Sequence, residues 1–127
     1  NIRDAVQPFN ILDTSRKTIK IFDVVASDDG MEKYTDTNFA AKIQKGAARL
    51  RDLLKNFIYD YDYILIDCPT QWLFFSKSSV YASDVVLIPT KHTDLKSLDN
   101  AARVITDFIP EVKEAKRDGG PIALPIF

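Results

Sequence analysis

The sequence predicts an α/β fold with a mostly parallel sheet that helices cover on both faces. Segments rich in β-branched and apolar residues alternate with segments of helical periodicity along the 127 residues. Two strand-like segments, 63–67 and 84–89, are apolar almost without a break, which is typical of strands buried on both faces of a parallel sheet. Right-handed crossovers are expected to connect such strands. The length fits one domain, so we expect a single domain over residues 1–127.

The first half of the chain predicts one strand and one long helix. Residues 1–17 predict a short helical piece followed by a polar turn, and residues 18–27 predict the first strand, closed by the turn signal SDDG. Asp36 or Thr37 is expected to cap the helix that comes next. The apolar stripe of this helix recurs at helical spacing and consists of Phe39, Ala40, Ile43, Ala47, Leu50, Leu54 and Phe57.

The second half predicts three more strands with helices between them. In chain order they are a strand at 63–67, a short buried helix at 72–83, a strand at 84–89, a helix capped by Thr93 or Asp94, a turn at 117–120 and a last strand at 121–127. Pro110 is expected to let the chain leave the capped helix, because proline disrupts a helix interior. The inner face predicted for that helix consists of Leu95, Leu98, Ala102, Ile105 and Ile109.

Composition excludes several classes of protein. The formal net charge of −1 gives no overall electrostatic attraction to nucleic acid or to an anionic membrane. Cys68 is the single cysteine, so the chain can form no internal disulfide. No apolar run approaches the roughly 18 residues of a spanning helix, and the N-terminus lacks the pattern of a signal peptide, so we expect a cytoplasmic protein. The chain starts without methionine and stops inside an apolar run, so we expect a fragment truncated at both ends.

Asp67 is the residue that most strongly suggests a site. It ends the apolar segment 63–67, and ligands of open parallel sheets bind beyond the carboxyl ends of the strands. A carboxylate there can hold Mg²⁺, directly or through its water shell, because Mg²⁺ prefers oxygen ligands. It can equally cap the following helix, since acidic residues favour helix N-termini. Cys68 beside it is expected to be a small buried thiol rather than a nucleophile, and the aromatic run that begins at Trp72 is expected to be core or a covered surface.

Two stretches resemble the ParA/MinD group of partition and positioning ATPases. They are YDYILIDCPT, residues 61–70, and ASDVVLIPT, residues 82–90, and LRDLLKNF upstream is similar to the helix that precedes the first of them. The resemblance covers roughly residues 37–110. The positions that match the family pattern are Tyr61, Asp62, Tyr63, Asp67, Cys68, Pro69, Ala82, Asp84 and Pro89.

The resemblance implies a P-loop nucleotide-binding (Rossmann-like) fold that uses ATP and Mg²⁺. It places Asp67 at the family's magnesium-associated aspartate, with the ion held through water. It places Pro69 and Thr70 at the start of the second switch segment, near the γ-phosphate. It also implies an ATP-bound homodimer, non-specific DNA binding, a partner protein that stimulates hydrolysis, and a role in chromosome or plasmid partitioning. This chain would be the central to C-terminal part of such a domain.

The sequence departs from the family pattern in two ways. Thr70 stands where the family has a second proline, and the glycine-rich phosphate loop is absent, because none of the four glycines belongs to a loop with the required lysine and hydroxyl. We therefore expect the 127-residue chain to show no tight binding of ATP and no hydrolysis by itself, although the full-length protein is expected to be an ATPase.

Other readings of the sequence stay open. A phosphoreceiver domain also ends a central strand in an aspartate, with Asp67 as acceptor and Thr90 and Lys91 as its later strand-end residues, but these two are adjacent here rather than on different strands. A non-catalytic α/β interaction module is a further alternative. The basic face of the long helix, from Lys42 to Lys55, gives slight support to DNA binding, although a solvated helix surface is the ordinary explanation.

Overall fold

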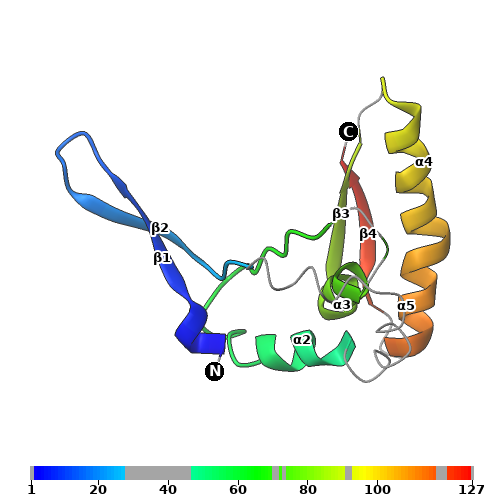
Figure 1. Ribbon diagram of the computed structural model, residues 1–127, viewed down its shortest axis with the longest axis horizontal. Helices are drawn as coiled ribbons and strands as arrows, with labels where there is room; N and C mark the ends of the chain where they lie inside the picture. Colours follow the sequence, from blue (N-terminus) through cyan, green and yellow to red (C-terminus); the bar gives the residue numbers. More distant parts are fainter. Residues whose placement is uncertain are drawn as a thin grey trace. The chain divides into compact units, whose positions relative to one another are not determined.

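The computed structural model describes residues 2–27, 47–69, 72, 74–90, 93–116 and 120–126. The chain divides into two compact units, residues 1–33 and residues 34–127. Helices and strands occur in both halves of the sequence, and Figure 1 shows the individual elements. The expectation of one domain over residues 1–127 stays a prediction.

The first unit is a β-hairpin preceded by one turn of 3-10 helix, η1, at Ile2–Ala5. Strands β1 (Gln7–Leu12) and β2 (Thr18–Val24) pair antiparallel, with an irregularity in register between Phe9 and Asn10. Asp13 closes the connecting turn, because its Oδ1 accepts hydrogen bonds from the backbone N–H groups of Ser15 and Lys17, both at 2.8 Å. The polar turn was therefore predicted correctly.

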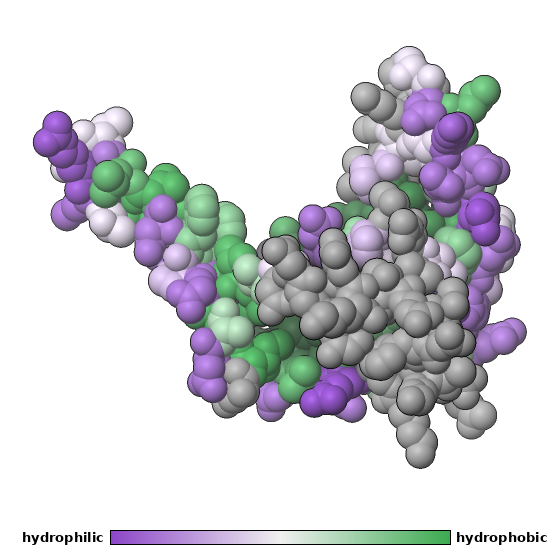
Figure 2. Space-filling model, in the orientation of Figure 1, coloured by the Kyte–Doolittle hydropathy of each residue, from purple (hydrophilic) through white to green (hydrophobic). Residues whose placement is uncertain are grey.

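Strand β1 was not predicted, and the strand at residues 18–27 was assigned the wrong kind of partner. Its neighbour is β1, which runs antiparallel, rather than a parallel strand across a helix. The turn between two short apolar runs is the signal that should have predicted a hairpin. The rings of Phe9 and Phe22 stack with centroids 4.7 Å apart, and Figure 2 shows hydrophobic side chains gathered along the hairpin.

The second unit contains a parallel pair of strands, as predicted for this part of the chain. Strands β3 (Val85–Pro89) and β4 (Ile122–Ile126) pair in register from Val85↔Ile122 to Pro89↔Ile126. Helix α3 (Phe74–Ala82) confirms the short buried helix expected at 72–83. The core consists of Val80, Ile109 and Val112, with Trp72, Tyr81, Val86, Val104 and Ala123 packed against it. The sheet side chains in this core alternate with Val85, Leu87, Ile122 and Leu124, which are exposed.

The strand predicted at residues 63–67 is wrong. Residues 63–69 form no strand and pair with none, and the side chains of Tyr63 and Leu65 are both 86% exposed. An apolar run favours an extended backbone, but a strand exists only when a neighbouring backbone supplies hydrogen bonds. The described residues therefore contain one antiparallel and one parallel pair of strands, and not the mostly parallel sheet that the sequence predicts.

Helix α2 (Ala47–Leu54) is the described part of the long helix predicted from Thr37 to Phe57. Residues 28–46, with the expected cap and the start of the apolar stripe, lie outside the described residues. The helix ends three residues earlier than predicted and turns follow it, although Phe57 is buried as expected. Helix α2 packs against α3.

The last helical region is a single helix that contains a π-turn (Figure 1). It consists of α4 (Leu95–Arg103), the π-helical segment η4 (Val104–Phe108) and α5 (Ile109–Lys116). Asp94 caps it, confirming one of the two expected caps, because its Oδ1 accepts a hydrogen bond from Lys96 N–H at 3.0 Å.

Pro110 does not end this helix, in contrast to the prediction. The backbone N–H of Ile109 donates to the carbonyl of Val104, five residues earlier, so the hydrogen-bond register changes directly before the proline. Pro110 then stands in the first turn of α5, where its missing N–H is tolerated. The predicted inner face is also wrong in part, because Leu95, Leu98 and Ile105 are exposed while Ile109 is buried.

Candidate functional site

Asp67 lies in an extended segment that one helix holds in place. Asp67, Cys68 and Pro69 are exposed in the segment that follows the half-buried Ile66. The hydroxyl of Ser76, buried on α3, donates a hydrogen bond of 2.8 Å to the carbonyl of Pro69. Since a proline carbonyl at the end of an unpaired segment has no strand partner, this bond fixes the chain two residues after the carboxylate. Sequence reasoning missed Ser76, because a serine inside a helix carries no signal of its own.

Cys68 is a free cysteine that reaches the surface. Partial burial of its thiol, and to a smaller extent the negative charge of Asp67, raise the pKa of Cys68 above its ordinary value. The thiol is therefore held in its neutral form, which opposes a nucleophilic role. The expectation that the residue as a whole is buried is wrong, because it lies on the exposed segment rather than on a strand.

The structure brings Asp67 and Pro69 together on one segment, and Thr70 lies outside the described residues. Within the described ranges, no group of three His, Cys, Asp or Glu side chains could hold a metal ion. Mg²⁺ commonly keeps several waters and uses one or two carboxylates together with substrate phosphates. An exposed single carboxylate such as Asp67 fits one position of that arrangement, and the remaining ligands would have to come from water and a bound phosphate.

A concave region lies where β3 meets α4. A cleft of about 290 Å³ opens there, lined by Ile88, Pro89, Asp94, Lys96, Ser97, Asn100, Ala101 and Val104. Its place at the carboxyl end of a parallel strand is where α/β proteins bind ligands. Asp67 and Pro69, the described residues expected at the nucleotide site, do not line it, and Thr70, Lys91 and His92 lie outside the described residues.

A cluster of aromatic and charged side chains forms around Trp72, which follows the Asp67 segment in the chain. The rings of Trp72 and Phe108 stack with centroids 4.1 Å apart and planes inclined by 4°. Glu111 accepts hydrogen bonds from Trp72 Nε1 at 3.1 Å and from Lys77 Nζ at 2.7 Å, one at each carboxylate oxygen. The bond from Lys77 is the main cause that lowers the pKa of Glu111; partial burial opposes it, and the Trp72 bond and the charge of Lys77 add to it. Trp72 was expected to be core or a covered surface; it is half-buried and packs against the core, but its polar partners were not foreseen.

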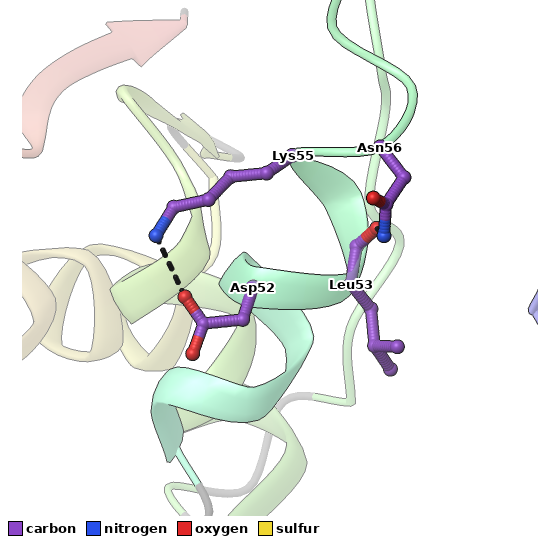
Figure 3. A network of polar contacts seen from close by, with 4 residues as sticks. All are labelled: Asp52, Leu53, Lys55 and Asn56. Carbon is purple, nitrogen blue, oxygen red and sulfur yellow. Dashed lines mark hydrogen bonds and ion pairs between the residues drawn. The ribbon is translucent and has the colours of Figure 1, made fainter.

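The basic face predicted on the long helix is only partly described. Lys42 and Lys45 lie outside the described residues. Figure 3 shows that Lys55 Nζ pairs with Asp52 Oδ1 at 2.7 Å, while Asn56 Nδ2 donates to the carbonyl of Leu53 at 3.1 Å. The charge of Lys55 is therefore partly neutralised by a neighbour on the same helix turn. Arg49 is exposed on α2.

The described part of the chain contains no helix with the length and apolar character needed to cross a membrane. A parallel strand pair with helices packed on one face defines the second unit as a mixed α/β domain.

Comparison with known proteins defines the family more closely. The model of an AAA domain family matches residues 4–119, and the chain belongs to that family, a P-loop NTPase type of domain found in ParA/MinD-like proteins. The chain is also similar to an uncharacterized protein of Pseudomonas putida strain KT2440 and to an uncharacterized protein in the gidB 3' region of Pseudomonas putida. Each is 36% identical over 78 residues, covering 57% of this chain and 30% of the relative. The chain thus spans about 30% of the length of these relatives. No solved structure matches it.

Proposed function

We propose that the full-length protein is a ParA-like ATPase, which binds and hydrolyses ATP with Mg²⁺ to drive the partitioning of chromosomal or plasmid DNA. The observation that carries the proposal is the family match over residues 4–119, which includes the Asp67 segment and the β3 segment. Within this family type, nucleotide and Mg²⁺ use is expected of full-length relatives. The glycine-rich loop is not in this sequence, so the 127-residue chain is expected to show neither tight ATP binding nor turnover by itself.

The residues of this chain would contribute position and charge rather than covalent chemistry. When bound, Mg²⁺ supplies positive charge that stabilises the phosphoryl group during its transfer. The Asp67 carboxylate would accept hydrogen bonds from the water shell of the ion, and the residue is exposed on its segment. Pro69 and Thr70 would follow next to the terminal phosphate. The Ser76 hydrogen bond to the Pro69 carbonyl would keep this segment at a fixed distance from α3.

Partners and location are part of the same proposal. Full-length protein with bound ATP would form a homodimer in the cytoplasm, contact DNA without sequence preference, and turn over faster when its partner protein binds. The described part of the basic face adds little support for the DNA contact, because Asp52 pairs with the charge of Lys55. Arg49 is exposed and remains available for such a contact.

ATP turnover by the full-length protein tests the proposal. Asp67→Ala and Asp67→Asn are expected to lower kcat by at least about 10²-fold, the usual cost of removing one electrostatic element from a phosphoryl-transfer or acyl-transfer site. Asp62→Ala is the matched control, because Asp62 is an exposed acid five residues earlier on the same stretch, and its turnover is expected to stay within two-fold. Equal turnover in all variants would remove Asp67 from the mechanism.

A phosphoreceiver domain is the alternative function, favoured by the exposed Asp67 carboxylate. Incubation with acetyl phosphate followed by mass spectrometry distinguishes the two. A phosphoryl group gained on Asp67 would support the receiver, and an unchanged mass together with Asp67-dependent ATP turnover supports the ATPase. Absence of both activities would leave a non-catalytic α/β interaction module.

A further inference from the structure

Trp72 connects the chain that follows Asp67 to the helix formed by α4, η4 and α5. Its ring stacks on Phe108 of η4, and its Nε1–H donates to Glu111 of α5. Lys77 of α3 donates to the other oxygen of the same carboxylate and lies 5.7 Å from the centroid of the Trp72 ring. One tryptophan is thereby held by a ring, a carboxylate and a cation from three different elements.

The two cations of this cluster lie on the outer sides of the stacked rings. Arg103 lies over the Phe108 ring, its guanidinium carbon 5.5 Å from the centroid, as Lys77 lies over Trp72. Since 4.1 Å between the ring centroids leaves no room for a cation between them, each cation faces the free side of its own ring.

The π-turn creates the contact between Arg103 and Phe108. In a regular α-helix with 3.6 residues per turn, side chains five positions apart point about 140° away from each other. In a π-turn, where the hydrogen bonds span five residues, the fifth residue returns close to the starting direction. The hydrogen bond from Ile109 N–H to the Val104 carbonyl spans five residues, and Phe108 lies within the turn that it closes.

Side-chain contacts hold the chain on both sides of residues 70 and 71, at Pro69 and at Trp72. Ser76 holds the Pro69 carbonyl from α3, and Trp72 is held against η4 and α5. Because residues 63–69 pair with no strand, side-chain contacts must replace the strand hydrogen bonds that would otherwise orient the carboxylate. A group that acts on a phosphate needs such support, since a displacement of about 1 Å can cost a large part of the rate.

We propose that Trp72 is a positioning residue, which holds the Asp67–Pro69 segment in its orientation through the stack on Phe108 and the hydrogen bond to Glu111. The effect of Trp72 on the reaction rests on the proposed ATPase function, whereas its positioning of the Asp67–Pro69 segment does not.

Labelling of Cys68 tests the positioning without any nucleotide. Cys68 lies on the held segment, and its reaction with a maleimide can be followed in the full-length protein by mass spectrometry of its peptide. Phe108→Leu and Glu111→Gln each remove one contact of Trp72, and the labelling rate is expected to rise about five-fold for each. Tyr59→Leu is the control, because Tyr59 is 96% exposed, and its rate is expected to stay within two-fold of the wild type. Circular dichroism confirms that each variant is folded.

A rate that stays within two-fold of the wild type in both folded variants would overturn the proposal. A five-fold rise for Tyr59→Leu as well would also overturn it, since the effect would then not be specific to the Trp72 contacts.

Kinetics of ATP hydrolysis separate positioning from general stability. Trp72→Leu is expected to lower kcat about ten-fold with KM within two-fold of the wild type, because only the orientation of Asp67 changes. Trp72→Phe keeps the stacking ring and is expected to recover part of kcat. Unchanged kcat in Trp72→Leu would contradict the consequence for the reaction. A wild type that hydrolyses no ATP, with labelling rates that rise as expected, would overturn the proposed function and leave the positioning role intact.

Discussion

Truncation of two isoleucines four residues apart tests the π-turn directly. Ile109 is 4% exposed and packs with Val80 and Val112, whereas Ile105 is 43% exposed. In an uninterrupted α-helix, residues four apart lie on the same face, so both would be buried. Ile109→Ala removes about three buried methyl or methylene groups, about 2.4 kcal/mol of transfer free energy at 0.8 kcal/mol each. With the cavity that remains, the free energy of unfolding is expected to fall by about 3 kcal/mol.

The matched variant Ile105→Ala is expected to change the free energy of unfolding by less than about 0.5 kcal/mol. Its exposed side chain contributes little burial, and alanine has the higher helix propensity. Urea denaturation followed by far-UV circular dichroism measures both variants, and at a slope of about 1.5 kcal/mol/M the midpoint of Ile109→Ala should fall by about 2 M. Equal losses in the two variants would refute the π-turn and restore the continuous inner face that the sequence predicts.

Two further predictions concern the cluster around Glu111 and the start of α4. Since the pKa of Glu111 is lowered in the folded protein, its contribution to stability is present above the unfolded pKa, near 4.5, and is lost as pH falls through the lowered folded value. The unfolding free energy measured from pH 6 to pH 3 should therefore decline less steeply in Glu111→Gln than in the wild type, and parallel profiles would contradict this. Asp94→Ala should lower the unfolding free energy by about 1 kcal/mol through loss of the cap on Lys96 N–H, with Asp94→Ser restoring most of it; an unchanged urea midpoint for Asp94→Ala would show that the cap contributes nothing.

The local sequence pattern singled out Asp67 but not the residues that surround it, and the role of Asp67 in a site stays a prediction. Asp67 and Pro69 could be identified because they follow an apolar run and because the pattern around them resembles a known family. Ser76, Phe108 and Glu111 could not be identified, since Ser76 meets Pro69, and Phe108 and Glu111 meet Trp72, only through the tertiary structure. A serine or glutamate in a helix has the same local sequence pattern whether or not it meets a partner.

The sequence by itself determined where most elements lie and what kind they are. Helical periodicity, capping residues and continuous apolar runs predicted α3, the start of α4, β3 and β4, because these signals depend on residues close together in the chain. The tertiary structure decided which strands pair and which helix face is buried. The run at 63–67 has the composition of a strand, yet no neighbouring backbone pairs with it, and the π-turn before Pro110 separates Ile105 from Ile109 although their spacing is helical. Pairing and packing depend on groups far apart along the chain, so a local pattern supplies the preference but not the partner.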